Sequence, residues 1–310
     1  MRRFSGGIGA VVALAAAAGL GSSAGAARTN ICQLTTRQAI ESCKLSARSD
    51  KAVAVGKCAN GADPAARKTC LQQASADTKD ALKTCTDERG VRETSCMKLG
   101  PAAYHAAIDP ANFVAAIDNP YFPLKPGTRF VYEGQTPQGL EHVEFFVTHN
   151  TKVILGVTCV EVHDTVQTAG QLTEDTLDWF AQDKDGNVWY FGEHTMELEG
   201  GLATTLAGTF VAGVDGAQPG IIMEAHPAIG DFYRQEFDLR NAEDFAEVVS
   251  LNESVTAGGV SYTNCLKTKE TTPLEPDLLE NKFYAANVGN IMTLDATTGQ
   301  RSELISVTME

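Results

Sequence analysis

The hydrophobic and polar positions divide the chain into two parts with different patterns. Residues 28–100 are rich in Ala, Lys, Gln, Asp and Leu and almost empty of aromatic residues, which is typical of helices. Beyond residue 100, runs of β-branched and aromatic residues alternate with turn signals, as in antiparallel sheets. We therefore predict an α+β protein, in which an α-helical hairpin precedes a mainly antiparallel β barrel or half-barrel. A connector at 101–127 is expected to lead into the β domain, residues 128–310.

Capping signals predict two long helices in the first part. Thr35 or Thr36 can cap the first helix, which is expected to run to about residue 59. Asp63 followed by Pro64 predicts the start of the second helix, since aspartate is a favoured cap and proline fits the first turn. Gly90 is expected to break or bend this second helix before a last short turn.

Six of the eight cysteines lie in the helical part, and their spacing is symmetric. Successive intervals between residues 32 and 96 are 11, 15, 12, 15 and 11, centred on residue 64. Residues equidistant from the turn of an antiparallel hairpin face each other, and 11 and 15 residues are close to whole numbers of helical turns. The spacing predicts three nested disulfides, Cys32–Cys96, Cys43–Cys85 and Cys58–Cys70. A thiolate metal site is the weaker interpretation, because no CxxC pair or cysteine–histidine cluster is present.

The second part predicts about a dozen strands. They are expected at 128–134, 141–149, 152–166, 173–182, 187–198, 206–212, 232–239, 246–256, 260–271, 279–286, 289–295 and 302–309. The two remaining cysteines fall in two of these strands, and an even cysteine count is typical of an exported, oxidised chain. A fourth disulfide, Cys159–Cys265, is therefore expected.

The hairpin expected at 173–194 carries the first group of candidate ligand-binding residues. With Asp-Gly at its tip, Gln182 should pair with Asn187 and Phe180 with Trp189. Alternation then gives an apolar core face, formed by Leu177, Trp179, Ala181, Val188 and Tyr190. The opposite face combines aromatic rings with carboxylates, and is formed by Thr176, Asp178, Phe180, Trp189, Phe191 and Glu193. This face either lines a ligand cavity or is a partly solvated outer surface.

A second polar cluster lies at 224–236. His226, Arg234 and Glu236 complete the candidate ligand-binding residues. Arg234 and Glu236 share a strand face, so they either form an ion pair or, if the face points inward, offer an anchor for an anion or carboxylate.

The first 26 residues have the layout of a cleaved signal peptide. Arg2 and Arg3 precede an apolar stretch at 8–20, and small residues at 24–26 supply a cleavage site. The stretch is too short to span a bilayer, so we expect an exported protein, periplasmic or extracellular, with no transmembrane segment after cleavage.

Charge also separates the two parts. Residues 28–100 contain 13 basic and 8 acidic residues, whereas 101–310 contain 10 basic and 31 acidic residues. Such an acidic domain argues against nucleic acid or an anionic membrane as its partner, and is more typical of a soluble surface or of cation binding.

Familiar catalytic and metal-binding signatures are missing from the sequence beyond the expected signal peptide. Residues 27–310, after the expected cleavage site, contain no GxSxG, HExxH, phosphate-loop or dinucleotide motif. The segment 183–194 resembles a calcium loop, but its glycine is two positions early and His194 replaces the final glutamate. The six histidines are scattered, so we predict no metal and no cofactor.

Three segments resemble a family of exported bacterial proteins of unknown function. They are 117–127 (IDNPYFPLKPG), 174–193 (EDTLDWFAQDKDGNVWYFGE) and the stretch from 220 to 236 that ends in GDFYRQE. The resemblance spans about 109–308 and implies an exported bacterial β domain, but no reaction. The cysteine hairpin looks like an addition found with some members.

These observations leave three functional hypotheses. The first is an exported β domain that binds a small or lipophilic ligand, or an envelope partner, with the hairpin as a brace. The second is a secreted hydrolase or lyase that uses Asp178 and Glu193, with His226 as an additional candidate. The third is a purely structural envelope protein. A deep cavity containing both carboxylates would favour binding or catalysis, and a filled interior would favour a structural role.

Overall fold

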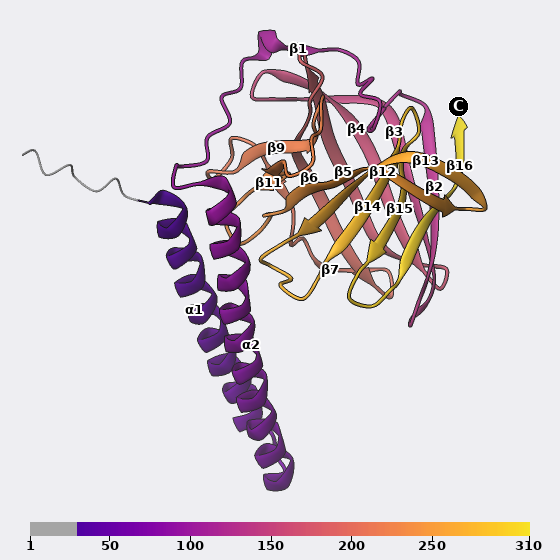
Figure 1. The fold of residues 1–310 in the computed structure, drawn as a ribbon. Coiled ribbons are helices and arrows are strands. Elements are labelled where there is room, and N and C mark those ends of the chain that lie inside the picture. Colours follow the sequence, from indigo (N-terminus) through magenta and orange to yellow (C-terminus); the bar gives the residue numbers. More distant parts are fainter. Residues whose placement is uncertain (1–29) are drawn as a thin grey trace, which may run out of the picture.

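The computed structural model describes residues 30–310 and shows two long helices beside a β barrel (Figure 1). The helices are α1 (Ile31–Ala59) and α2 (Pro64–Leu99), and a short 3-10 helix η1 (Pro110–Asn112) lies in the segment that leads to the barrel. None of the helices within residues 30–310 is long and apolar enough to cross a membrane. The expected signal peptide lies outside the described residues.

One antiparallel sheet forms the barrel. Its long strands are β2 (Thr128–Thr136), β3 (Gly139–Ile154), β4 (Val157–Thr168), β5 (Gln171–Asp183), β6 (Val188–Glu199), β12 (Phe245–Ala257), β13 (Val260–Thr271), β14 (Glu280–Ala285), β15 (Gly289–Asp295) and β16 (Arg301–Met309). Its short strands are β1 (Phe113–Val114), β7 (Leu202–Thr205), β8 (Phe210–Val211), β9 (Gln218–Met223), β10 (Phe232–Arg234) and β11 (Glu236–Phe237). The predicted fold class, a helical hairpin followed by an antiparallel barrel, is confirmed.

The caps and the course of the helices differ from the sequence expectation in two places. Asn30, not Thr35 or Thr36, caps α1, because its side-chain oxygen accepts a hydrogen bond from the Gln33 amide at 2.9 Å. The expected break at Gly90 is also wrong, since α2 continues to residue 99. Glycine in a helix costs only about 1 kcal/mol relative to alanine, and disulfides on both sides of Gly90 hold the helix in place.

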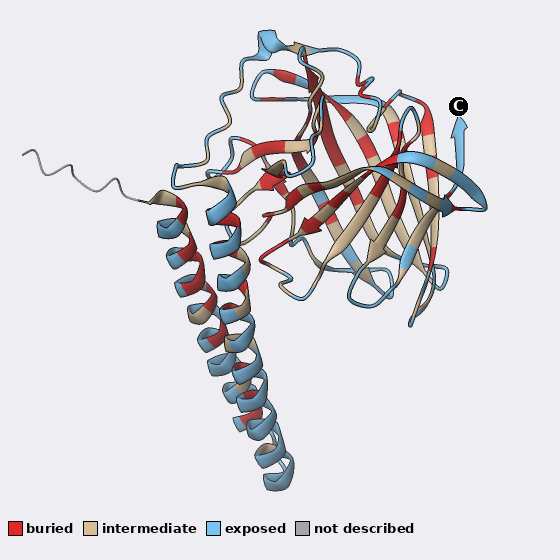
Figure 2. Ribbon diagram, in the orientation of Figure 1, coloured by how far each residue is buried: buried red, intermediate tan, exposed pale blue. Residues whose placement is uncertain are grey.

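The three nested disulfides are confirmed. Cys32–Cys96, Cys43–Cys85 and Cys58–Cys70 join α1 to α2, with Cα–Cα distances of 5.7, 5.8 and 5.6 Å. Most hairpin side chains are exposed, as Figure 2 shows along the outer length of both helices. Because little apolar surface is buried between them, the bridges supply much of the order of the hairpin. Such bridges indicate a compartment outside the reducing cytosol.

The expected Cys159–Cys265 disulfide is wrong, and both thiols are free and fully buried. Cys159 lies on β4 and Cys265 on β13, and in the order of the sheet five strands separate them: β14, β15, β16, β2 and β3. The two side chains also belong to different apolar clusters. The sequence could place both in strands but not on neighbouring ones.

Some strand boundaries also differ from the prediction. A break was expected near 149–152, but β3 runs through it to Ile154 and turns at Leu155 and Gly156. The short strands β7 and β9 were not predicted. β9 is nevertheless essential, because it pairs with β11 at the place where the two ends of the sheet approach each other.

A short continuous segment closes the barrel. The sheet runs β10-β12-β13-β14-β15-β16-β2-β3-β4-β5-β6-β9-β11, so its two ends are β10 and β11. Only Gln235 separates these strands along the chain, and the segment therefore crosses from one end of the sheet to the other. Gly220 on β9 lies so close to this segment that a Cβ atom would collide with the Gln235 backbone. The antiparallel sheet is thus a nearly closed barrel.

Two ion pairs, one buried and one half-buried, attach the hairpin to the chain that runs from this closing segment into β12. Arg92 on α2 donates to Glu243 at 2.5 Å, and their side chains are only 4% and 2% exposed. Glu243 also accepts a hydrogen bond from the Arg240 backbone amide at 2.6 Å. Lys98 adds a half-buried pair with Glu247 on β12 at 2.6 Å. The lower part of the hairpin extends away from the barrel (Figure 1).

The disulfide pattern predicts a definite thiol count. Under non-reducing conditions, the unfolded protein should expose two reactive thiols, and peptide mapping should recover the three nested bridges. The folded protein should expose none, because Cys159 and Cys265 are 0% exposed. An unfolded, unreduced protein without any reactive thiol would show that these two cysteines are bridged after all.

The Arg92–Glu243 pair predicts a large loss of stability on truncation. Arg92→Met should lower the free energy of unfolding by about 3–5 kcal/mol, because it leaves Glu243 buried without its cation. Lys83→Met is the matched control, since its pair with Asp87 is exposed and should leave the stability nearly unchanged. Chemical denaturation measures both, and equal effects would mean that the buried pair does not hold the hairpin.

Candidate functional site

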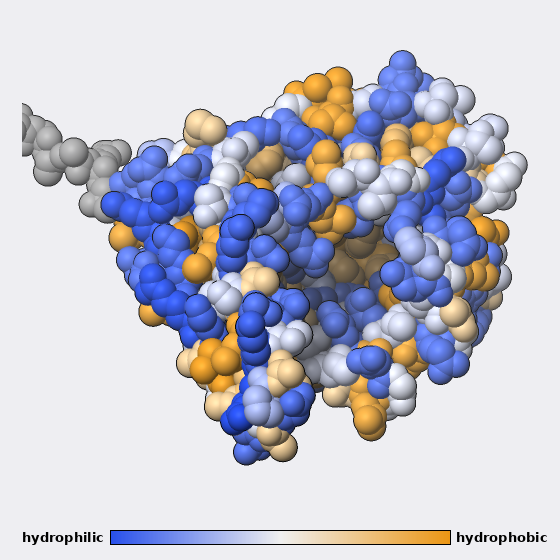
Figure 3. Space-filling model, turned by 90° about the horizontal axis from the view of Figure 1, so that it is seen from below, coloured by the Kyte–Doolittle hydropathy of each residue, from blue (hydrophilic) through white to orange (hydrophobic). Residues whose placement is uncertain are grey.

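The interior of the barrel contains a cavity of about 630 Å³. Seen from the barrel end opposite the connector, the molecule is hollowed, with hydrophilic residues around the opening and more apolar ones at depth (Figure 3). The connector covers the other end, where Phe122, Pro123 and Leu124 line the cavity. The cavity is therefore a pocket with one open end and one covered end.

Aromatic rings form the covered end of the pocket. Phe122 packs edge-on against Phe180, with ring centroids 5.4 Å apart, and against Phe145 at 6.4 Å. Phe130 meets Phe145 at 6.1 Å in the same way. The geometry leaves ring faces and edges available to an apolar ligand.

Carboxyl groups dominate the remainder of the lining. Eight acidic residues contribute, namely Glu141, Asp164, Glu174, Asp178, Glu193, Glu236, Asp244 and Glu280. Three of them lie near the strand ends that surround the opening: Glu141 on β3, Glu174 on β5 and Glu280 on β14. The pocket thus changes from aromatic at depth to acidic toward the opening.

A tyrosine joins two of the predicted site residues. The Tyr190 hydroxyl lies 2.5 Å from Asp178 Oδ1 and 2.9 Å from Glu193 Oε2. The same hydroxyl is the donor in both contacts, so the two carboxyls share one hydrogen-bond donor. Burial, together with the charges of Asp164 and Glu193, raises the pKa of Asp178 well above its usual value, which favours its protonated form.

Burial raises the pKa of other carboxyls in the pocket too. The pKa of Asp164 rises to about 7, because of burial and the charges of Glu174 and Glu193. Burial likewise raises the pKa of Glu193 to about 7 and that of Asp244 to about 6. Glu236, buried beside Asp244 and Glu193, has a pKa well above its usual range. The acidic lining is therefore partly protonated near neutral pH.

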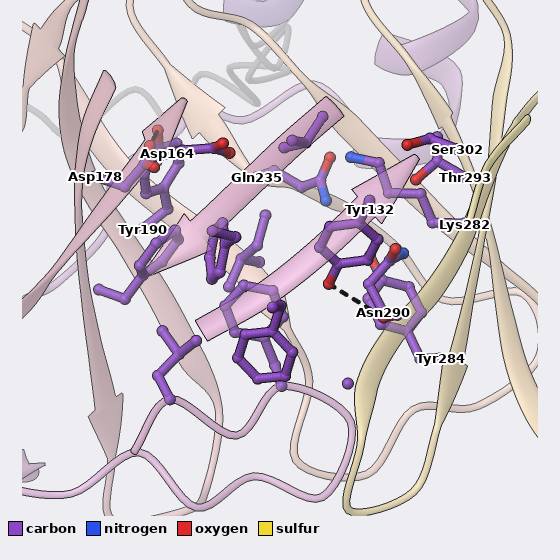
Figure 4. Close-up of a pocket in the computed structure, with 18 of the residues that line it drawn as sticks. Tyr132, Asp164, Asp178, Tyr190, Gln235, Lys282, Tyr284, Asn290, Thr293 and Ser302 are labelled. Atoms are coloured by element: carbon purple, nitrogen blue, oxygen red, sulfur yellow. Dashed lines mark hydrogen bonds between the residues drawn. The ribbon is translucent and has the colours of Figure 1, made fainter. Parts of the chain in front are cut away.

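Lys282 is the only basic residue among those that line the pocket, and its charge is already matched. Its Nζ lies 2.8 Å from Glu270 and 3.7 Å from Glu280. Burial opposes its charge, but these two carboxylates together raise its pKa well above the usual value. Figure 4 shows Lys282 on the side of the pocket opposite Asp178 and Tyr190.

The register of the β5–β6 hairpin corrects the predicted faces. The expected pairs Gln182–Asn187 and Phe180–Trp189 are wrong: Gln182 pairs with Val188 and Phe180 with Tyr190. A slip of one residue turns every side chain of a strand to the other face. Tyr190, expected in ordinary core, therefore faces the pocket.

Trp189 and Phe191 lie on the outside of the barrel, against expectation. Both pack against Phe113 of the connector, at centroid distances of 6.4 and 5.4 Å. The Trp189 indole also donates to Asp183 at 2.9 Å. They belong to a second apolar cluster between the barrel and its connector.

A bulge returns Glu193 to the pocket. Between the pairs Phe180–Tyr190 and Trp179–Gly192, β6 contains one extra residue, so Asp178 and Glu193 stand opposite each other. Gly192 makes this possible, because its φ of 147° is unfavourable for other residues and a Cβ would collide with Phe210. The slip and the bulge together place Asp178, Phe180 and Glu193 in the pocket.

The residues of the second predicted cluster do not share one face of the segment that closes the barrel. Glu236 lines the pocket, but Arg234 points away from it and packs among Tyr104, Phe237 and Phe245. Its guanidinium lies 4.7 Å from the ring centroids of Phe237 and Phe245. The Arg234–Glu236 ion pair and the inward anion anchor are therefore both wrong. His226 is exposed and lies outside the pocket lining.

Sequence reasoning missed many polar residues of the pocket, among them Asp164, Gln235, Asp244 and Lys282. Alternation along β4 and β14 could have placed Asp164 and Lys282 on the same faces as their apolar neighbours Val162 and Tyr284. No local signal marks Gln235 and Asp244, because closure of the barrel alone brings them to the cavity.

The pocket carboxylates are too dispersed to form a compact metal site. Among residues 30–310, the only three possible ligands with atoms within 4.8 Å of one another are Cys43, Cys85 and Glu88. That cluster is in the hairpin, and both of its sulfurs belong to a disulfide.

Comparisons with known proteins leave the function open. No family model matches the chain, and no curated protein does. Among solved structures, a "putative lipoprotein" from Parabacteroides distasonis ATCC 8503 is 14% identical, over 61% of this chain and 98% of that one, with a TM-score of 0.30. The function must therefore be argued from the pocket itself.

The raised pKa of Glu193 predicts a pH-dependent stability. The folded protein retains this proton up to about pH 7, whereas the unfolded chain releases it near the ordinary glutamate pKa. This contribution is present at low pH and is lost as the pH rises through about 7. Between pH 5 and 8, the melting temperature of the Glu193→Gln variant should therefore fall by about 5–10 °C less than that of the wild type.

Glu199→Gln, at an exposed position of the same strand, is the control for this comparison. Its melting temperature should change with pH as the wild type does. If Glu193→Gln also followed the wild type, the carboxyl would be ionised throughout this pH range.

Proposed function

We propose that the barrel binds a small, partly apolar molecule in its pocket. The observation that carries this proposal is the unfilled cavity of about 630 Å³ with an aromatic end. Ligand pockets usually measure about 300–1,000 Å³ and combine an apolar lining with a few polar groups. A barrel with a purely structural role would be expected to fill its interior with side chains.

In this proposal the disulfide-linked hairpin acts as a brace. Arg92 and Lys98 attach it to the segment that closes the barrel, beside the pocket residues Glu236 and Asp244. The protein would act in the periplasm or outside the cell, where the three disulfides remain oxidised. The resemblance to exported bacterial proteins supports the same location.

Acid–base catalysis is a second candidate, favoured by one specific observation. Asp178 and Glu193 face the pocket and share Tyr190, and the raised pKa of Asp178 suits a proton donor. His226 cannot assist, because it lies outside the pocket. If the protein is an enzyme, Asp178→Asn should abolish turnover of the bound molecule without unfolding the protein.

A cavity-filling variant tests the binding proposal. Val143 lines the pocket, so Val143→Trp should occupy it and weaken binding of the neutral dye Nile red by at least about tenfold in a fluorescence titration. Val153→Trp is the matched control, since Val153 is on the same strand but 67% exposed, and it should bind as the wild type does.

Native mass spectrometry of protein purified from its own host provides an independent measurement. A retained small molecule would be released from the wild type and absent from Val143→Trp. If no molecule is retained and the wild type does not bind Nile red, the proposal is wrong and a structural role is favoured.

A further inference from the structure

We infer that the ligand is an organic cation, in which an amine or ammonium group is joined to an aromatic or aliphatic body that also carries a hydrogen-bond acceptor. This inference rests on the proposed binding function and adds to it the chemical class of the ligand. It follows from the charge of the lining, from polar groups without partners and from the arrangement of both along the pocket.

The charge of the lining favours a cation. Eight carboxyl groups and one basic group line the pocket, and the basic group, Lys282, is already paired with Glu270 and Glu280. Like charges in a medium of low dielectric constant repel strongly, which is why several of these carboxyls retain protons. A cationic group would relieve that repulsion, whereas a carboxylate or phosphate would increase it.

Three polar groups of the lining, independent of the overall charge, also lack partners within residues 30–310. Gln235 is only 3% exposed and reaches into the pocket (Figure 4), yet its Nε2 donates to no acceptor, and neither does Asn290 Nδ2. Asp164 Oδ1 is sealed from solvent and likewise unpartnered. Buried polar groups are almost always hydrogen-bonded, so all three are expected to find partners in a ligand. Asp164 requires a donor, which an ammonium group supplies, and the two amide groups require an acceptor.

The order of these groups along the pocket orients the ligand. The aromatic rings of Phe122, Phe130 and Phe145 occupy the covered end, Asp164 lies across the sheet from Phe145, and further carboxyls such as Glu141 and Glu174 lie near the opening. An apolar body would therefore enter first and pack against the rings, while its cationic group stays among the carboxyls. A ligand of this shape buries its apolar surface and keeps its charge paired.

Two other ligand classes fit less well. A divalent metal requires several oxygens around one point, and no three pocket carboxylates within residues 30–310 approach that closely. A neutral lipophilic molecule would satisfy the aromatic end but leave Asp164 without a donor and the acidic repulsion unchanged.

Three probes of nearly equal size test the charge class: 4-phenylbutylamine, 4-phenylbutan-1-ol and 4-phenylbutanoate. Each is titrated against the full-length protein carrying Nile red, and displacement of the dye is measured. The amine should bind at least about tenfold more tightly than the alcohol, as expected of a charge-assisted hydrogen bond, and the carboxylate should bind weakest.

Asp164→Asn should remove most of the preference for the amine, because it keeps the shape of the side chain but not its charge. Glu199→Gln, an exposed change on β6, is the control and should preserve the preference. If Asp164→Asn does not fold, Glu236→Gln tests the same point, since Glu236 also lines the pocket.

The outcomes separate this inference from the proposed function. If Nile red binds but the amine binds no better than the alcohol, or the carboxylate binds best, the cation class is wrong and the binding function stands. If Nile red and all three probes fail to bind, both proposals are wrong. If the amine preference survives in both carboxyl variants, the pocket carboxyls do not recognise the charge and the inference fails.

Discussion

Closure of the barrel by the segment from Phe232 to Phe245 is the constraint on which the rest of the structure depends. β10 pairs with β12 and β11 with β9, so one stretch of chain joins the two ends of the sheet. Its residues face two different surroundings: Glu236 and Asp244 face the pocket, whereas Arg234 and Glu243 face the hairpin and connector. The same segment therefore seals the sheet, supplies polar groups to the pocket and anchors the hairpin.

This arrangement links the position of the hairpin to the segment that closes the barrel. Arg92 is almost fully buried beside Glu243, and a buried charge that loses its partner is strongly destabilising. Movement of α2 away from the barrel would therefore disturb the segment that includes Asp244. The disulfides keep α2 rigid over the length that makes this contact, although few apolar side chains pack between the helices.

The acidic lining of the pocket suits a chemical function but opposes the stability of the fold. Its carboxyl groups are removed from water without matching cations, and burial raises the pKa of each strongly affected group. A domain that needed only a stable core would fill this volume with apolar side chains. Protonation of the carboxyls reduces the electrostatic cost of burying them. The Tyr190 hydroxyl makes a hydrogen-bonded contact with both Asp178 and Glu193. The pocket is thus better explained by the proposed binding function than by a contribution to stability.

The sequence by itself determined the features that depend on local periodicity. Cysteine spacing predicted three disulfides because helical geometry is regular, and turn signals predicted most strands and the fold class. Tertiary structure alone decided which residues face the pocket. Successive side chains of a strand point to opposite faces of the sheet. A slip of one residue and one bulge therefore placed Tyr190 in the pocket, where Trp189 and Phe191 were expected. Neighbouring strands in a closed sheet can be far apart in sequence. The sequence therefore could not show that Cys159 and Cys265 lie on distant strands, or that Gln235 lines the pocket.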